Sequence, residues 1–175
     1  MFNIPKITKN LLIINVIVYL ATLVMWRGLD LNDVFGLHFF LAPDFHFYQF
    51  FTYMFMHAGF MHLFLNMFAL WMFGRVVENV WGPKKFLFYY MACGVGAGLF
   101  QEVAQFVQFH VIAAQQVPGI GMFELLQVAE ANAEGLNTWT TVGASGAVYG
   151  ILLAFGMIFP EQRIFIFPFP FPIKA

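Results

Sequence analysis

Long apolar runs alternate with shorter polar stretches along this chain. The runs predict four membrane-spanning helices, at about residues 11–26, 60–80, 86–100 and 142–159. The first ends at bulky Met25 and Trp26 rather than at small residues, so it reads as an uncleaved span with an interfacial Trp anchor and not as a signal peptide. The pattern therefore predicts an all-α, polytopic transmembrane helix bundle.

Two of the connections between these runs have a distinctive composition. Residues 28–49 alternate aspartates with phenylalanines, which predicts a loop lying in the membrane interface. Residues 101–141 are rich in Glu and Gln and contain no Lys or Arg. We expect this stretch to be a polar loop with one short surface helix at about 122–133, ended by Gly135.

Composition supports the membrane assignment and excludes other classes. The chain of 175 residues is 61% hydrophobic and only 10% charged, with a mean hydropathy of +0.77, more apolar surface than a soluble domain of this size can bury. The net charge of −1, without a basic stripe, argues against a nucleic-acid partner. Cys93 is the only cysteine, so no disulfide forms within the chain.

The distribution of charge predicts the orientation. Apart from Arg27, the basic residues lie at the N-terminus, at 75–85, and at Arg163 and Lys174, whereas the other two connections are acidic. The N-terminus, the second connection and the C-terminal end are therefore expected in the cytoplasm. This orientation brings the start of the second span and the start of the fourth span to the same depth, in the outer half of the bilayer.

Candidate chemistry is concentrated at those two helix starts. Ser145 is the only serine in the chain, and Gly143 and Gly146 leave it uncrowded. His62 and Asn66 are four residues apart and so share a helix face. A serine facing an imidazole and a carboxamide is what acyl transfer requires, because the hydroxyl attacks and the donors stabilise the oxyanion.

Other interpretations of these residues stay open. His62 and Asn66 would also suit hydrogen bonds between helices, and glycines at 146 and 150 would suit close helix packing. A metal site at His57 and His62 is disfavoured, because residues five apart do not share a helix face. An aspartyl protease is disfavoured because every Asp falls in an expected loop.

Two segments resemble the rhomboid family of intramembrane serine proteases. Residues 57–66, HAGFMHLFLN, carry the family's His, His and Asn spacing, and residues 143–150, GASGAVYG, carry its Gly-x-Ser-Gly with a Tyr four residues after the serine. The resemblance covers nearly the whole chain. It implies a six-span fold, cleavage of single-pass membrane proteins near the outer membrane face, and no cofactor or metal.

The resemblance also implies individual roles. Ser145 would be the nucleophile, and its own N–H would join His62 and Asn66 in stabilising the oxyanion. Tyr149 would stack on the catalytic imidazole.

The glycines and the outer histidine would support the site. Gly143 would leave room for the substrate backbone and Gly146 for the serine, and His57 would order the outer rim.

The sequence departs from the family pattern in two places. Tyr48 and Gln49 stand where many members have Trp-Arg, and the family's general-base histidine, on a sixth helix, has no counterpart here. His38, His46 and His110 are expected in loops or at a helix end. We expect residues 1–43 to hold the first helix and the start of the interfacial loop, and 44–175 to be a rhomboid domain cut before its fifth and sixth helices, inactive alone.

The resemblance leaves a second function and several properties open. The alternative is a non-catalytic rhomboid-like protein that binds membrane helices, and a plain structural subunit is a third possibility. The expected partners are the lipid bilayer and transmembrane protein substrates, in a bacterial inner membrane. The sequence does not indicate the substrate or the oligomeric state.

Overall fold

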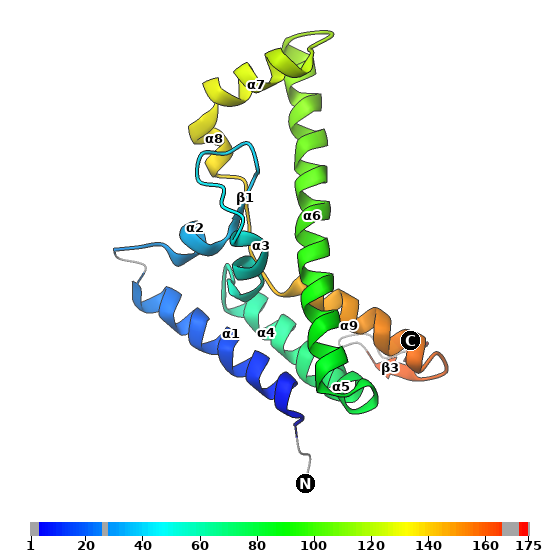
Figure 1. Ribbon diagram of the computed structural model, residues 1–175. Coiled ribbons are helices and arrows are strands. Elements are labelled where there is room, and N and C mark those ends of the chain that lie inside the picture. Colours follow the sequence, from blue (N-terminus) through cyan, green and yellow to red (C-terminus); the bar gives the residue numbers. More distant parts are fainter. Residues whose placement is uncertain (1–3, 26–27, 166–171, 175) are drawn as a thin grey trace.

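A bundle of apolar helices organises the part of the chain that the structure, a computed structural model, describes: residues 4–25, 28–165 and 172–174 (Figure 1). Its spanning elements are α1 (Lys6–Met25), the continuous series α4 (Phe60–Ala69), η2 (Leu70–Gly74, a π-helix) and α5 (Arg75–Trp81), then α6 (Pro83–Gln116) and α9 (Ser145–Ile158). Among the described residues, the first three of these are long and apolar enough to cross a membrane, and α9 is a shorter apolar helix of 14 residues. The expected all-α membrane bundle is confirmed, whereas the expected anchor Trp26 lies outside the described residues.

Helix α6 corrects the expected third span. The sequence predicted an end near Phe100, followed by a polar loop, but the helix continues for 34 residues to Gln116. Two polar residues of this added stretch are buried: the Glu102 carboxyl accepts the Phe40 N–H at 2.8 Å, and the Gln105 amide donates to the Trp139 carbonyl at 3.4 Å. Polar side chains that were taken as evidence for a loop instead hold other segments against the helix.

The connection after α6 returns toward the bundle. It contains α7 (Met122–Ala131) and α8 (Ala133–Asn137), so the expected short helix is present. The helical break lies at Asn132, however, and Gly135 lies inside α8 rather than ending a helix. Together with the outer half of α6 these helices enclose a second apolar core, separate from the core of the bundle, built from Phe39, Ala42, Phe109, Ala113, Ile120, Leu125, Ala129 and Leu136.

The outer loop, residues 28–59, is more ordered than the expected interfacial loop. It contains α2 (Leu31–Phe35), β1 (Leu37–His38), α3 (Gln49–Thr52) and the 3-10 helix η1 (Tyr53–Phe55). Strand β1 pairs antiparallel with β2 (Thr140–Thr141), with Leu37 opposite Thr141 and His38 opposite Thr140. Near the C-terminus β3 (Arg163–Phe165) pairs antiparallel with β4 (Pro172–Lys174).

A carboxylate joins the start of α1 to α5. Glu78 is 3% exposed and accepts the backbone N–H groups of Ile7 and Thr8, at 2.9 and 2.7 Å, and the Thr8 hydroxyl at 2.7 Å. The first N–H groups of a helix have no partner inside that helix, and they favour a negative charge. Glu78 therefore caps α1 from another helix.

Candidate active site

Ser145 is the first residue of α9, and a strained turn precedes it. Gly143 has φ +127°, a conformation that side chains other than glycine rarely adopt, and its N–H donates to the Tyr53 carbonyl at 2.9 Å. The Val148 N–H donates to the Ala144 carbonyl at 2.9 Å, the first hydrogen bond of the helix. The N–H groups of Ser145 and of the two residues after it therefore have no partner within α9. The positive end of α9 is thus at Ser145.

The His62 ring lies directly against Gly143. A Cβ atom placed on Gly143 would be 2.6 Å from His62 Cε1, 2.7 Å from His62 Nε2 and 3.7 Å from Ser145 Oγ. Glycine is therefore required by space as well as by φ. The ring of α4 and the hydroxyl of α9 approach the same Cα atom from two helices.

Asn66 lies one turn further along α4. It is 6% exposed, and its amide nitrogen donates to the His62 carbonyl at 3.0 Å. This bond uses one of the two amide hydrogens. This hydrogen bond lies within α4, whereas one interpretation of the sequence expected Asn66 to form a hydrogen bond between helices.

His57 is a buried neighbour of His62. It is 1% exposed, neither ring nitrogen has a hydrogen-bond partner among the described residues, and its ring centroid is 5.1 Å from that of His62. Burial, reinforced by the nearby His62, lowers the pKa of His57 to about 4, so the ring is neutral near pH 7.

The two rings are neighbours although the two histidines share no helix face, so the spacing rule does not describe their placement. It assumed that both residues lie on one helix, but α4 begins at Phe60 and His57 precedes it. The described residues contain no group of three or more His, Cys, Asp or Glu arranged to hold a metal ion.

Gly146 and Tyr149 lie differently from each other on α9. A Cβ on Gly146 would clash with the Ala97 Cβ of α6, so this glycine permits close packing of the two helices. Tyr149, three residues further along α9, is 71% exposed. Gly146 thus serves the packing of α9 on α6 in addition to leaving space near the serine.

Tyr53 is a residue of this region that the sequence did not indicate. It is buried, its hydroxyl donates to the Gly94 carbonyl at 2.6 Å, and its carbonyl holds Gly143. Burial raises the pKa of its hydroxyl to about 12. A single Tyr in a short 3-10 segment has no periodicity that would have marked it.

Comparison with known proteins shows the family of this chain. The family model described as Rhomboid domain matches residues 44–175, which include every candidate residue. The chain belongs to the rhomboid family. It is also 30% identical over 118 residues to "Rhomboid protein 1, mitochondrial" of Saccharomyces cerevisiae; the match covers 67% of this chain and 27% of that protein.

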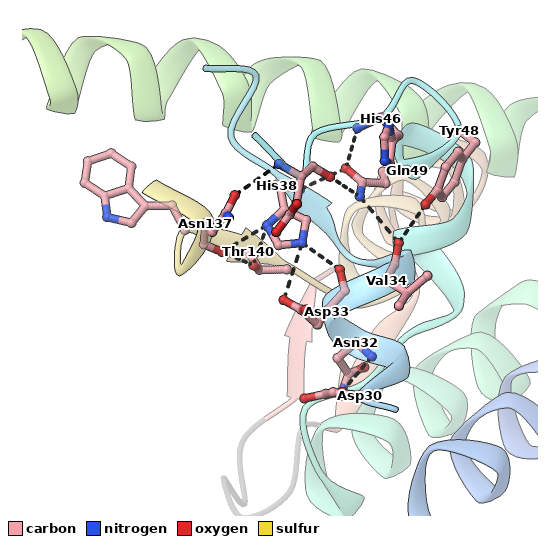
Figure 2. A network of polar contacts seen from close by, with 12 residues as sticks. Asp30, Asn32, Asp33, Val34, His38, His46, Tyr48, Gln49, Asn137 and Thr140 are labelled. Carbon is pink, nitrogen blue, oxygen red and sulfur yellow. Dashed lines mark hydrogen bonds and ion pairs between the residues drawn. The ribbon is translucent and has the colours of Figure 1, made fainter. Parts of the chain in front are cut away.

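Where many rhomboid proteins have Trp-Arg, this chain uses Gln49 to anchor the outer loop (Figure 2). Gln49 is 1% exposed; its side-chain oxygen accepts the N–H groups of His38 and His46 at 3.3 and 3.0 Å, and its nitrogen donates to the Asp44 carbonyl at 2.9 Å. Tyr48 donates its hydroxyl to the Val34 carbonyl at 3.0 Å. Anchoring is done by neutral hydrogen bonds.

The remaining histidines are engaged elsewhere in this rhomboid chain. His38 is buried in β1 with partners in α2, α8 and β2, and His46 stacks on Tyr48 at 5.3 Å between centroids. His110 lies exposed inside α6, which corrects its expected place in a loop or at a helix end.

Proposed function

We propose that this chain carries the nucleophile and the oxyanion donors of a rhomboid-type intramembrane serine endopeptidase. It would cleave transmembrane proteins near the outer membrane face, without cofactor or metal. The observation that carries the proposal is the packing of His62 against Gly143, two residues before the only serine of the chain. Membership of the rhomboid family supports the reaction class.

The proposed reaction begins with attack of the Ser145 hydroxyl on a substrate carbonyl carbon. The hydroxyl proton passes to a general base, and the carbonyl oxygen becomes an oxyanion. Its donors would be the N–H of Ser145, the His62 ring and the second amide hydrogen of Asn66. Removing one such donor from a site of this kind lowers the rate by about 10² to 10³.

None of three buried or loop histidines, namely His38, His46 and His57, is assigned as the general base. His38 spends both ring nitrogens on contacts in the outer loop, His46 is exposed on that loop, and His57 is neutral and buried beside His62. Without a base the serine hydroxyl is a weak nucleophile. We therefore propose that this chain supplies one part of the active site.

The orientation is proposed from charge alone. Lys6 and Lys9 at the start of α1 and Lys84 and Lys85 at the start of α6 would face the cytoplasm, and Ser145 the outer half of the bilayer. We propose a bacterial inner membrane. The yeast relative is named mitochondrial, so reporter fusions at the N-terminus and in the α7–α8 connection are the direct test.

A fluorophosphonate probe and a transmembrane reporter substrate test the function in the full-length protein. We expect labelling and cleavage in the wild type, loss of both in Ser145→Ala, and retention of both in Cys93→Ala, which removes the thiol of α6. Cleavage by Ser145→Ala would exclude Ser145 as the nucleophile. A folded wild type that neither labels nor cleaves, but retains membrane helices in pull-down, would identify the non-catalytic binder.

A further inference from the structure

A polar cleft of about 510 Å³ lies between the start of α1 and α5, at the end of the bundle away from Ser145. Its lining residues are Ile4, Pro5, Lys6, Lys9, Asn10 and Asn79. Lys9 and Asn10 are three and four residues beyond Lys6, so the three side chains share one face of α1. Asn79 faces them from α5. The hydrogen bonds of the neighbouring Glu78 to the start of α1 fix the two walls of the cleft relative to each other (Figure 1).

The polar side chains of this cleft are available to a ligand. Lys6, Lys9, Asn10 and Asn79 are exposed, and in the described part of the chain none of these four side chains has a hydrogen-bond or ion-pair partner. Two ammonium groups and two amides therefore offer several donors to one ligand, and the amide oxygens also offer acceptors. The donors and their positive charge indicate an anionic ligand.

The charge around the cleft favours an anion as well. The basic residues of α1, α5 and the start of α6 are Lys6, Lys9, Arg75, Lys84 and Lys85. Among the described residues, the carboxylates at this end of the bundle are Glu78 and Glu161. Glu78 is buried, and both of its oxygens already accept hydrogen bonds from α1. Positive charge therefore exceeds negative charge on the surface into which the cleft opens.

The position of the cleft along α1 corresponds to the headgroup layer of a membrane. Residues 11–25 carry no charge, and Lys6, Lys9 and Asn10 come directly before this apolar run. Lysines that border a spanning helix lie at the level of the lipid headgroups. Ile4 and Pro5 add apolar surface to the same cleft. A ligand that is anionic at one end and apolar at the other fits these surroundings better than a free ion does.

We propose that this cleft binds the phosphodiester headgroup of an anionic phospholipid. Lys6 and Lys9 balance the charge of the phosphate, and the amides of Asn10 and Asn79 bond the oxygens of the headgroup. Because its contacts come from α1 and from α5, the bound lipid joins the two helices beside Glu78 and stabilises the folded state by mass action. The binding does not depend on the chemistry proposed for Ser145.

Titration of the full-length protein with phosphatidylglycerol in neutral detergent tests the proposal, with native mass spectrometry and thermal unfolding as measurements. We expect one tightly bound lipid and a rise in the unfolding temperature. Lys6→Gln combined with Lys9→Gln should weaken this binding about thirtyfold, because each lysine contributes about 1 kcal/mol and 1.4 kcal/mol is a factor of ten. Lys84→Gln combined with Lys85→Gln removes the same charge from the same end but outside the cleft, and should leave the affinity nearly unchanged.

Two further variants separate a built site from general attraction to positive charge. Asn79→Ala leaves every charge in place and should still weaken binding about fivefold, the value of one hydrogen bond. Lys6→Arg combined with Lys9→Arg keeps the charge and should keep the binding. The unfolding temperatures of these variants without lipid report whether each is folded. Equal weakening by the two double lysine-to-glutamine variants would overturn the proposal, because the attraction would then belong to the whole surface.

Two other ligands identify the source of the phosphate. Phosphatidylcholine has the phosphodiester but no net charge, and it should bind more weakly and equally to the wild type and to the Lys6→Gln, Lys9→Gln variant. Glycerol 3-phosphate has no acyl chains and should not raise the unfolding temperature. A rise as large as that with phosphatidylglycerol would show that the cleft takes a free phosphate and would overturn the lipid assignment. Because none of these measurements involves Ser145, the outcome is independent of the proposed function.

Discussion

Buried polar groups at the two ends of the bundle are treated differently. At the end where α1 begins, the Glu78 carboxylate accepts three hydrogen bonds, and both of its oxygens are used. At the end where α9 begins, His57 is equally buried, yet neither ring nitrogen is bonded to any described residue. The Asn66 amide, beside it, uses one hydrogen on its own helix.

Under the proposed function, the contrast is between a polar group that holds two helices together, Glu78, and one that lies beside the site, His57. An unpaired polar group is costly in an apolar interior, so a group that only holds the fold is expected to be fully bonded. Groups that receive a substrate must keep donors available, and proteins accept the resulting loss of stability at such sites. Glu78 fits the first description. Under the proposed function, His62, Asn66 and Ser145 would fit the second.

The largest expected effect comes from Asn66→Ala. Loss of an oxyanion donor should lower reporter cleavage by about 10² to 10³, while the free energy of unfolding falls by only about 1 kcal/mol. Asn15→Ala is a matched control, because Asn15 is buried in α1 and donates to the carbonyl four residues earlier, that of Leu11, at 2.8 Å. The control should lose similar stability and keep its cleavage rate per folded molecule; equal loss of cleavage in both variants would contradict the distinction.

The next largest expected effect is at Glu78, where stability should fall and labelling of the serine should not. Glu78→Ala leaves two N–H groups and a hydroxyl without an acceptor and should reduce the free energy of unfolding by about 3 kcal/mol. Glu78→Gln keeps one acceptor oxygen and should lose less. Thermal unfolding in detergent measures both, and fluorophosphonate labelling per folded molecule should be unchanged; reduced labelling would place Glu78 in the functional group instead.

Gly146→Ala tests whether a residue next to Ser145 contributes to stability through helix packing. The new methyl group meets Ala97, so α6 and α9 must separate, at a cost of about 1 to 3 kcal/mol. Gly96→Ala is the control, since a Cβ there has no neighbour within 4 Å, and it should be neutral or slightly stabilising. Equal unfolding temperatures for the two variants would show that this packing contributes nothing.

The smallest expected effect is the acid sensitivity of His57. Its pKa is lowered from 6.5 to about 4 in the folded protein, so its contribution is complete above pH 6.5 and is lost as pH falls from there toward 4. We expect about 1 to 2 kcal/mol of stability to disappear as the pH falls from 6.5 to about 5. His57→Phe should remove this part of the pH dependence of thermal unfolding, whereas His46→Phe should leave it intact.

The sequence predicted the helices that are marked by long apolar runs and the one helix face that is marked by a spacing of four residues. Charge-free runs located α1, α4–α5 and α9, and the spacing of four put Asn66 one turn from His62. It did not predict the length of α6, because Glu102 resembles a loop residue until its partner, the N–H of Phe40, is known. That partner lies 62 residues away in the chain.

The contacts of the outer loop were equally invisible in the sequence. A ladder of two residues has no alternation to detect, and the partner of His38 in α8 is 99 residues away. Helical spacing also misled at His57, since spacing rules apply only within one helix. The candidate residues themselves came from a local motif, and their mutual placement required the tertiary fold.

Helix α6 is longer than the hydrocarbon layer of a bilayer is thick. At 1.5 Å per residue its 34 residues span about 51 Å, against about 30 Å for the hydrocarbon layer. If Lys84 and Lys85 lie at one headgroup surface, as the proposed orientation requires, the surplus turns would project into water at the other end, where α6 carries α7, α8 and their small apolar core (Figure 1). A thinner or thicker bilayer would then shift the membrane–water interface along α6, and with it the depth of Ser145 in the bilayer.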